Sequence, residues 1–454
     1  MKDATANTPD DTTVPRPKTS LLAVNEHTRK RNAAEGRFKI YGLIAVGIGL
    51  SFLVVLLSTI IWNGSRGFQQ TFLTLEVELL EAKLDKNGNR DPADLKKVST
   101  FGYAPLVDAA MQAKVAELGI ASPFTKAKDY RKILSASVPA QVRDFVLANP
   151  DLIGTTQEFT VLASSRVDGY LKGRVSRDSI ARDKNLDAEH LDVVDQLRAA
   201  GVIAKTFNWG FVFGADASDT RAESAGIGVS MLGSLFMMLV VLGLSLPIGV
   251  AASIYLEEFA PKNRWTDLIE VNISNLAAVP SIVFGILGLA VFIQVMHLPQ
   301  SAPLVGGLVL TLMTLPTIII STRASLKSVP PSIRDAALGV GASKMQSVFH
   351  HVLPLAAPGI LTGTIIGLAQ ALGETAPLLL IGMVGFIASN YPDGVIDGFV
   401  SPNSAMPAQI FEWAKRADPA FYERAWGGII ILLIFLVAMN TIAVLLRRRF
   451  ERRW

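Results

Sequence analysis

Six long apolar stretches constrain the fold of this chain more than any other feature of its sequence. They cover residues 40–62, 227–256, 273–296, 303–320, 359–386 and 427–446. As helices, they match the length needed to cross a hydrocarbon core about 30 Å thick. Only 18% of the residues are charged, against about 25% in soluble domains. We therefore predict an all-α integral membrane protein with six transmembrane helices, which excludes a soluble cytosolic enzyme.

Two polar segments flank the first apolar stretch and divide the chain. Residues 1–39 are rich in Thr, Pro, Asn and charged side chains, and we predict that they form a disordered arm. Residues 63–225 follow the first span at 40–62 and have the composition of a soluble domain. They are predicted to form an insert domain outside the bilayer, followed by a transmembrane domain over 226–450.

Local patterns inside the insert indicate helices. Residues 186–200 place Leu191, Val194 and Leu197 on one helical face, and a glycine follows the last periodic residue. Residues 101–119 have a similar helical pattern. The insert is therefore predicted to be mixed or mostly helical, with a fold that the sequence alone does not define.

Basic residues predict the orientation of the chain in the membrane. Cytoplasmic segments of membrane proteins carry an excess of Lys and Arg, counted over the short connections rather than over large domains. With both termini in the cytoplasm, the inner segments contain 19 Lys and Arg, and the short outer segments contain 3. This distribution predicts cytoplasmic termini and an insert on the opposite, periplasmic side. It also gives no indication of nucleic-acid binding.

Several chemistries are excluded by what the sequence lacks. It has no cysteine, no phosphate-binding P-loop and no G-x-S-x-G nucleophile motif. Its five histidines form no metal-binding pattern. We predict a non-catalytic protein with no metal site and no cofactor of its own. If it moves a solute uphill, the energy must come from an ion gradient or from a partner protein.

One cytoplasmic loop, residues 321–358, indicates such a partner. It contains Asp335-Ala336-Ala337, then Gly341 after three residues, and His351-Val352-Leu353-Pro354 after nine more. This spacing resembles the E-A-A-x3-G-x9-I-x-L-P signature of ATP-binding-cassette importer permeases, with Asp335 in place of Glu and His351 in place of Ile. Two alanines permit close helix contact, Gly341 permits a turn, and Pro354 is expected to break the helical run before the next span.

Three further segments narrow the resemblance. Residues 227–259, 279–285 and 363–377 are similar to the A-type permease subunit of the bacterial phosphate-specific importer, and the G-E-T-A-P-L-L block at 373–379 is the most specific element. The resemblance covers about 227–450. The long outer insert resembles the extended form of this family, which has an additional N-terminal domain.

The resemblance implies a set of partners and a location. It implies the bacterial inner membrane, a homologous second permease that completes a heterodimer, and two cytoplasmic ATPase subunits that bind ATP. It also implies a periplasmic phosphate-binding protein that delivers phosphate. The coupling loop would dock on an ATPase through Asp335, Ala336, Ala337 and Gly341, with Leu353 and Pro354 at the start of the next span.

Two ionisable residues are the main candidates for the pathway. Glu374 lies 15 residues beyond Gly359, which is about 22 Å along a helix. An ionisable group at that depth is expected to be functional, so we predict a role in gating with Thr375 beside it; pairing for assembly alone is the alternative. Arg323 is a candidate anion contact because a guanidinium grips phosphate oxygens in pairs. It could equally be an anchor at the cytoplasmic end of a span.

Two uncharged residues complete the candidate pathway. Gln370 occupies a position at which many members of the family have an arginine, so the compensating charge is expected on the partner permease. Ser281 could line the pathway with its hydroxyl group, or it could cap a helix interrupted by Pro280.

Two other functions remain open at this stage. The first is a permease for another oxyanion, such as sulfate or molybdate, although the G-E-T-A-P block at 373–377 argues against it. The second is a membrane sensor of external phosphate, which would need a cytoplasmic output domain larger than any inner segment here.

Overall fold

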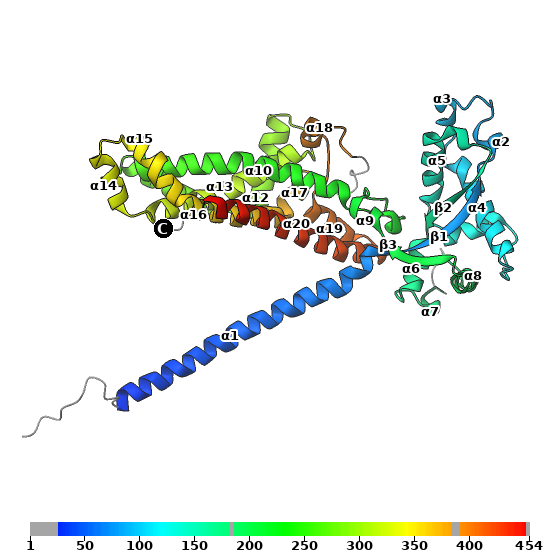
Figure 1. Ribbon diagram of the computed structural model, residues 1–454, viewed down its shortest axis with the longest axis horizontal. Helices are drawn as coiled ribbons and strands as arrows, with labels where there is room; N and C mark the ends of the chain where they lie inside the picture. Colours follow the sequence, from blue (N-terminus) through cyan, green and yellow to red (C-terminus); the bar gives the residue numbers. More distant parts are fainter. Residues whose placement is uncertain (1–25, 181–185, 384–390, 451–454) are drawn as a thin grey trace, which may run out of the picture. The chain divides into compact units, whose positions relative to one another are not determined.

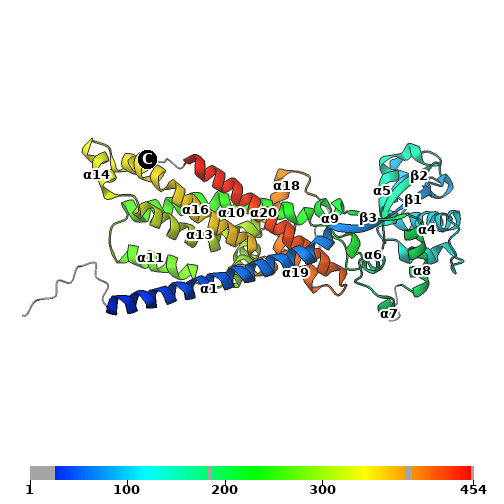
Figure 2. The same ribbon diagram turned by 60° about the horizontal axis from the view of Figure 1, so that its bottom comes forward.

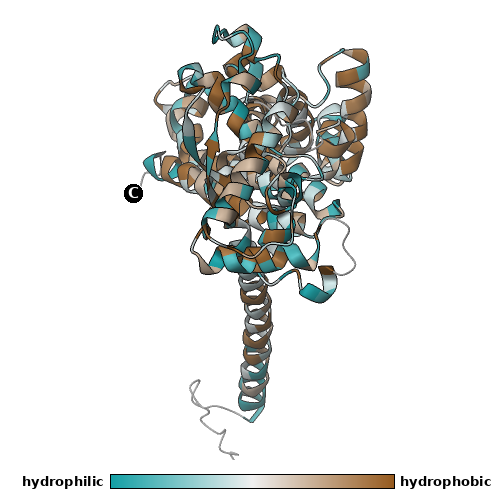
Figure 3. Cartoon of the chain, turned by 90° about the vertical axis from the view of Figure 1, so that its right-hand side faces the viewer, coloured by the Kyte–Doolittle hydropathy of each residue, from teal (hydrophilic) through white to brown (hydrophobic). Residues whose placement is uncertain are grey.

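The computed structural model describes residues 26–180, 186–383 and 391–450 (Figure 1). The chain divides into two units, residues 1–59 and residues 60–454. The first unit, as far as it is described, consists of most of helix α1 (Glu26–Gly64). Hydrophobic residues run along this helix, which is the long helix at the bottom of Figure 3.

Helix α1 begins earlier than the sequence predicted. The arm predicted over 1–39 is helical from Glu26 onward, and residues 1–25 lie outside the described residues. Two ion pairs between residues four apart, Lys30–Glu26 and Lys39–Glu35, support the extension. Adding turns to an existing transmembrane helix also avoids the cost of a new helix nucleus. The prediction of a disordered arm is therefore wrong for residues 26–39.

The insert is an α+β domain built around a three-stranded antiparallel sheet. The strand order is β2-β1-β3, with β1 at Gln69–Glu78, β2 at Thr156–Leu162 and β3 at Ile203–Phe207. Leu73, Leu75 and Val77 alternate along β1 and are fully buried. Because side chains in a strand point alternately to opposite faces, this alternation forms the apolar face of the sheet. The fold fits the mixed class that the sequence left open.

Helices complete the insert, and two of them were predicted. Helix α8 (Ala188–Ala199) buries Leu191, Val194 and Leu197, and it is followed by Gly201 at a φ of 74°. Helix α4 (Thr100–Glu117) corresponds to the helix predicted over 101–119. The remaining short elements are α2 (Glu81–Leu84), α3 (Pro92–Leu95), η2 (Ala127–Ile133), α5 (Val138–Ala148), η3 (Pro150–Leu152), α6 (Ser165–Leu171), α7 (Arg177–Ile180), α9 (Trp209–Phe213) and η4 (Ala222–Ser224).

Three long helices of the transmembrane domain pack side by side with α20 (Figures 1 and 2). They are α10 (Gly228–Ile254), α13 (Pro303–Lys327) and α16 (Leu353–Gly373), and α20 is Ala420–Phe450. A Cβ atom at Gly363 of α16 would overlap the Ser321 hydroxyl of α13, so the glycine sets this close approach. Three smaller elements, α17 (Ala376–Leu380), α18 (Val395–Val400) and α19 (Met406–Lys415), lie between α16 and α20 in the sequence.

Five helices of the described residues are long and apolar enough to cross a membrane, and a bent pair would make a sixth. The bent pair is α11 (Arg264–Ala277) with α12 (Ser281–Gly288) and its continuation η6 (Leu289–Val295), at an angle of 100°. The number of spans therefore reaches the predicted six only if the bent pair, which contains the stretch at 273–296, is counted as one broken span. Pro280 explains the break, because it lacks an N–H and disfavours a helical residue before it.

The fifth predicted span, 359–386, is also interrupted. Helix α16 ends at Gly373, Glu374 is extended with ψ at 130°, and α17 begins at Ala376. The ring of Pro377 would clash with the carbonyl group of Gly373 in a continuous helix, since a proline excludes the carbonyl four residues earlier. Residues 384–386 of the predicted span lie outside the described residues.

Candidate coupling and translocation sites

The predicted coupling loop forms a helix, a turn and a second helix. Helix α14 (Pro331–Gly339) starts after Pro330, and Gly341 reverses the chain at a φ of 87°. Nothing lies within 4 Å of the place where a Cβ of Gly341 would be, so the backbone conformation alone selects glycine here. The next helix, α15 (Lys344–Ser347), begins with a reciprocal cap between Ser343 and Gln346.

The three motif residues on α14 differ in their exposure to solvent. Asp335 and Ala336 are exposed, whereas Ala337 is buried against the rest of the loop. Four exposed apolar side chains extend the accessible surface around the turn: Leu338, Val340, Met345 and Phe349, which are 49%, 86%, 56% and 46% exposed. We call these four residues the loop patch. Clustered apolar side chains of this kind are typical of a surface that binds another protein.

An arginine next to the motif links the loop to the spans. Arg334 donates to Glu258 Oε1 at 2.6 Å, to the Val329 carbonyl at 2.8 Å and to the Leu326 carbonyl at 2.9 Å. Glu258 lies on η5 (Tyr255–Phe259), the π-helical end of α10. A displacement of α14 is therefore transmitted to both α10 and α13. The sequence analysis did not select Arg334, although it directly precedes the Asp335 motif.

The predicted break at Pro354 does not occur. The segment Lys344–Gly373 forms one long helical run, in which α15 passes through the π-helical turn η7 (Val348–Val352) into α16. Leu353 and Pro354 are the first residues of α16. Because a π-turn changes the backbone hydrogen-bond pattern, the chain accommodates the proline's missing N–H at the junction. The helix that follows the Gly341 turn is thus continuous with a span.

Glu374 lies at the break in the fifth span. Its side chain is half-buried, and it makes no ion pair or side-chain hydrogen bond with the described part of the chain. It directly follows the C-terminus of α16, where the helix dipole is negative and disfavours a carboxylate. Thr375 then starts α17 without a side-chain capping bond. This arrangement leaves an ionisable group with unused hydrogen-bonding capacity inside the transmembrane domain.

Helices α12 and α17, which each follow a break in a span, and helix α13 contact one another near Glu374. A Cβ atom at Gly285 of α12 would contact Pro377 of α17, and one at Gly288 would contact Val309 of α13. Ser281 is the first residue of α12 and follows Pro280 without a capping bond of its own. The structure therefore joins the elements that carry Ser281 and Glu374. Gln370, one turn before Glu374, is exposed on α16.

Arg323 lies further along α13, away from the contact between α12 and α17. It is 14 residues beyond Val309 on α13, or about 21 Å along the helix. Its Nη2 donates to Glu270 on α11 at 2.6 Å, and its Nε is 3.4 Å from Glu257 on η5. Lys327 adds a second cation 3.6 Å from Glu257. In this conformation Arg323 is engaged by carboxylates, and its contact with an anion stays a prediction.

A second group of charged residues, which the sequence analysis missed, joins the insert to α20. Arg424 is 3% exposed and donates to the carbonyl groups of Ala222, Gly67 and Glu223 at 3.1, 2.9 and 3.0 Å, and to Gln70 Oε1 at 2.5 Å. The first and last segments of the insert are therefore fixed to the start of α20. The adjacent charges Glu423-Arg424 at the start of an apolar stretch are the one signal in the sequence for this joint.

Ion pairs surround this joint on the insert side. Glu423 forms ion pairs with Lys172 at 3.3 Å and with Arg174 at 2.5 Å. Arg166 forms an ion pair with Asp418 at 3.3 Å. Buried pairs of this kind are costly to break, because the remaining charge is left without a partner. The carboxyl group of Glu223 lies nearby and accepts from the Ser135 hydroxyl at 2.5 Å. Burial raises the pKa of Glu223, although this hydrogen bond acts in the opposite direction.

Comparisons with known proteins agree with the geometry of the transmembrane domain. Residues 245–454 match the family described as "Binding-protein-dependent transport system inner membrane component". The "Phosphate transport system permease protein PstA" of Mycobacterium leprae is 31% identical over 232 residues, covering 51% of this chain and 73% of that protein. The chain belongs to the PstA family of phosphate transport system permeases.

Two further matches complete the comparison. The "Probable ABC transporter permease protein YqgI" of Bacillus subtilis is 32% identical over 241 residues, covering 51% of this chain and 81% of that protein. A solved structure of the inward-facing MetNI methionine ABC transporter covers 49% of this chain and 95% of its own chain, at 15% identity and a TM-score of 0.39.

The family assigns the chain to a transporter complex and to a membrane. As a PstA-family member, it is a multi-pass inner-membrane permease that functions in an ABC transporter complex with an ATPase and other subunits. Residues 25–181 match a second family, described as "Domain of unknown function (DUF3333)". This match covers α1 and most of the insert, and it supports the extra N-terminal domain predicted from the sequence.

Proposed function

We propose that this chain is a permease subunit of an ATP-driven phosphate importer, in which it forms half of the translocation pathway. Membership of the PstA family and the phosphate transport named for its relatives support this substrate. The G-E-T-A-P-L-L block at 373–379, the most specific element of the resemblance, lies at the interrupted fifth span. Sulfate or molybdate transport is the alternative that the experiment below distinguishes.

The coupling loop is the observation that carries the proposal. Its exposed helix α14, the Gly341 turn and the loop patch form an accessible surface. Arg334 connects this surface to the ends of α10 and α13 through Glu258 and two carbonyl groups. A cytoplasmic ATPase that binds the loop patch would therefore move the spans when nucleotide closes it.

Glu374 is proposed to gate the pathway rather than to bind phosphate. A carboxylate repels an anion. Because Glu374 also lies at the negative end of the α16 dipole, its charge would be stabilised by a nearby cation. A cation on the second permease would meet this need in one state of the transport cycle. Arg323 and Ser281 remain proposed pathway contacts, and Arg323 would first have to exchange Glu257 and Glu270 for an anion.

The complete transporter is proposed to contain four kinds of component. This permease pairs with a homologous second permease, two ATPase subunits bind ATP on the cytoplasmic side, and a periplasmic phosphate-binding protein delivers the substrate. Both termini of this chain and the loop patch would face the cytoplasm, with the insert in the periplasm. The chain itself would hold no cofactor and would catalyse no reaction.

Deletion of the gene for this chain tests the proposal in cells. The expected result is loss of ATP-dependent phosphate uptake at low external phosphate, with recovery when the intact chain is restored. Loss of sulfate or molybdate uptake with normal phosphate uptake would support the alternative oxyanion. Normal uptake of all three, combined with altered expression of phosphate-responsive genes, would instead favour the sensor function.

A further inference from the structure

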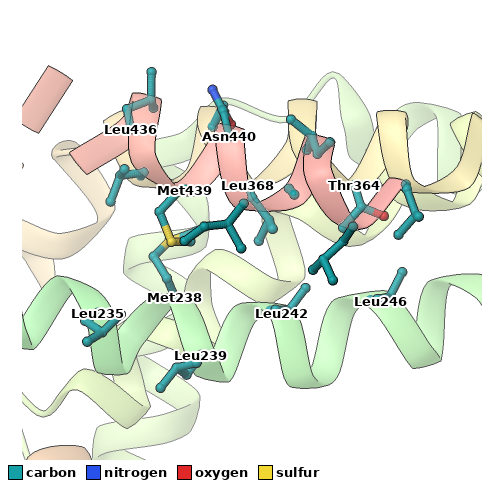
Figure 4. Close-up of a pocket in the computed structure, with 17 residues that line it drawn as sticks. Leu235, Met238, Leu239, Leu242, Leu246, Thr364, Leu368, Leu436, Met439 and Asn440 are labelled. Atoms are coloured by element: carbon teal, nitrogen blue, oxygen red, sulfur yellow. The ribbon is translucent and has the colours of Figure 1, made fainter. Parts of the chain in front are cut away.

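An apolar groove runs along one face of the transmembrane domain, between α10, α16 and α20 (Figure 4). Its volume is about 290 Å³. Almost every side chain on its walls is apolar, and Thr364 satisfies its own hydroxyl by donating to the Ile360 carbonyl at 2.9 Å. The groove is open to its surroundings, because the wall residues Leu239 and Leu446 are 48% and 52% exposed. Figure 4 shows Leu239, Met238 and Leu368 among the side chains that line it.

A positively charged side chain, Arg447, lies at one end of this groove. Leu361 and Leu446 are wall residues at that end, and they directly precede Thr362 and Arg447 in the sequence. Arg447 Nη1 donates to Thr362 Oγ1 at 3.1 Å, while its Nε–H is buried and has no acceptor in the described part of the chain. The Arg447 side chain is partly exposed and has no carboxylate partner in the described part of the chain, so its guanidinium is suited to an incoming anion.

The length of the groove relates it to one leaflet of a bilayer. On α20 the walls extend from Leu436 to Leu446, which is about 15 Å along a helix. This is about half of a 30 Å hydrocarbon core. A single lipid chain that enters the groove from the leaflet on the Arg447 side would therefore end near its far wall. Its headgroup would lie beside Arg447, whereas Arg449, two residues further along, projects from another side of α20.

We propose that the groove binds an acyl chain of an anionic phospholipid, with the lipid phosphate held by Arg447. The apolar walls favour a hydrocarbon chain, and the unpaired guanidinium favours an anionic headgroup over a zwitterionic one. A free phosphate ion would leave the groove empty, and a transmembrane helix of another subunit would have to bring its own carboxylate to Arg447. The proposed lipid satisfies both features, and it does not depend on which solute the permease transports.

Spin-labelled lipids test this site on the full chain. The protein would be reconstituted in phosphatidylcholine with traces of labelled phosphatidylglycerol or labelled phosphatidylcholine, and the immobilised lipid fraction would be measured by electron paramagnetic resonance. We expect Arg447→Gln to weaken association of phosphatidylglycerol about tenfold, since a hydrogen bond to a charged group contributes about 1.5 kcal/mol. Phosphatidylcholine should be unaffected by this change. Arg449→Gln, on the same helix beyond the groove, is the matched control.

A second pair of variants tests the walls. Ala443→Phe fills the groove and should reduce the immobilised fraction of both lipids, whereas Ala438→Phe on an exposed face of α20 should not. Equal losses in Arg447→Gln and Arg449→Gln, or no loss in Ala443→Phe, would overturn the proposal. Displacement of the bound lipid by inorganic phosphate, or by addition of the second permease, would also overturn it, because the groove would then belong to a different ligand.

Discussion

Arg424 satisfies four oxygen acceptors at the base of α20, and its effect can be tested by substitution. Arg424→Ala removes the donor and leaves the Gly67, Ala222 and Glu223 carbonyl groups without their partner. We expect the unfolding free energy to fall by about 3–5 kcal/mol, because several buried oxygen acceptors each lose a hydrogen bond from a charged donor. Thermal unfolding of the purified chain in detergent measures the loss. Arg448→Ala, at an exposed position of the same helix, should have an effect below about 0.5 kcal/mol.

His190 predicts a dependence of insert stability on pH. Its Nδ1 accepts from the Asp187 N–H at 3.3 Å, and its Nε2 lies 3.0 Å from the Asp129 carbonyl, so the neutral ring with the proton on Nε2 fits both partners. Burial lowers the pKa of His190 below its ordinary 6.5. Between the two pKa values the unfolded chain binds the proton more readily than the folded chain. The insert should therefore lose stability as the pH falls through 6.5 and below.

Melting curves at pH 7.5 and pH 5.5 check this prediction. The unfolding midpoint should be lower at pH 5.5, and His190→Gln should reduce the difference between the two midpoints. An identical pH dependence in the wild type and the variant would show that His190 is not the group responsible. The sign for Glu223 is opposite, because its raised pKa lets the folded state hold a proton more tightly and makes the insert less stable as the pH rises from 4.5.

Substitution of Glu374 tests the proposal that its carboxylate gates the pathway. Glu374→Gln keeps the size of the side chain and removes its charge. Phosphate uptake is expected to fall at least tenfold, while the ATPase still copurifies with the permease. Glu374→Asp, which retains the charge, should keep more of the activity. Normal uptake by Glu374→Gln would contradict a role for the carboxylate in gating.

At the scale of elements, the Gly341 turn controls the shape of the coupling loop. Gly341→Val places a β-branched residue at a φ of 87°, which costs about 1–2 kcal/mol in the left-handed region. The turn would distort, and Leu338 on α14 would move apart from Met345 and Phe349 on the other side of the turn. Copurification of the ATPase should decrease, and Gly339→Ala, where the added Cβ has open space, should leave it unchanged. Equal ATPase recovery with both variants would show that docking does not require this turn.

Local patterns in the sequence were enough for some elements and insufficient for others. The periodicity of Leu191, Val194 and Leu197 predicted α8 because a helical face depends on neighbouring residues alone. The alternation of Leu73, Leu75 and Val77 was a comparable signal for β1. Its pairing with β2 and β3 depends on residues far away in the chain, which periodicity cannot give.

The breaks in the spans follow from prolines whose effect could have been recognised. Pro280 and Pro377 end helices within apolar stretches that hydropathy alone treats as continuous. At Pro354 the helix does not end, because the π-helical turn η7 just before it accommodates the missing N–H. A proline therefore predicts an altered hydrogen-bond pattern, and the neighbouring backbone decides whether the helix ends.

At the scale of the whole molecule, the Gly341 turn of the loop was predictable and the insert joint was not. The motif from Asp335 to Pro354 is contiguous in the sequence, so its spacing alone predicted the turn, and its docking on an ATPase stays a prediction. Arg424 instead contacts Gly67 and Glu223, which are 357 and 201 residues away along the chain. Only the fold brings such residues together, and the same holds for Arg334 with Glu258.

Reconstituted transport tests the central claim most directly. Proteoliposomes would contain this chain, its proposed second permease and the ATPase, with the phosphate-binding protein added on the insert side. We predict uptake of labelled phosphate that requires ATP on the opposite side, that is lost in Glu374→Gln, and that excess sulfate does not inhibit. ATP-dependent uptake of sulfate in preference to phosphate, or phosphate uptake that is unchanged when this chain is omitted, would contradict the account.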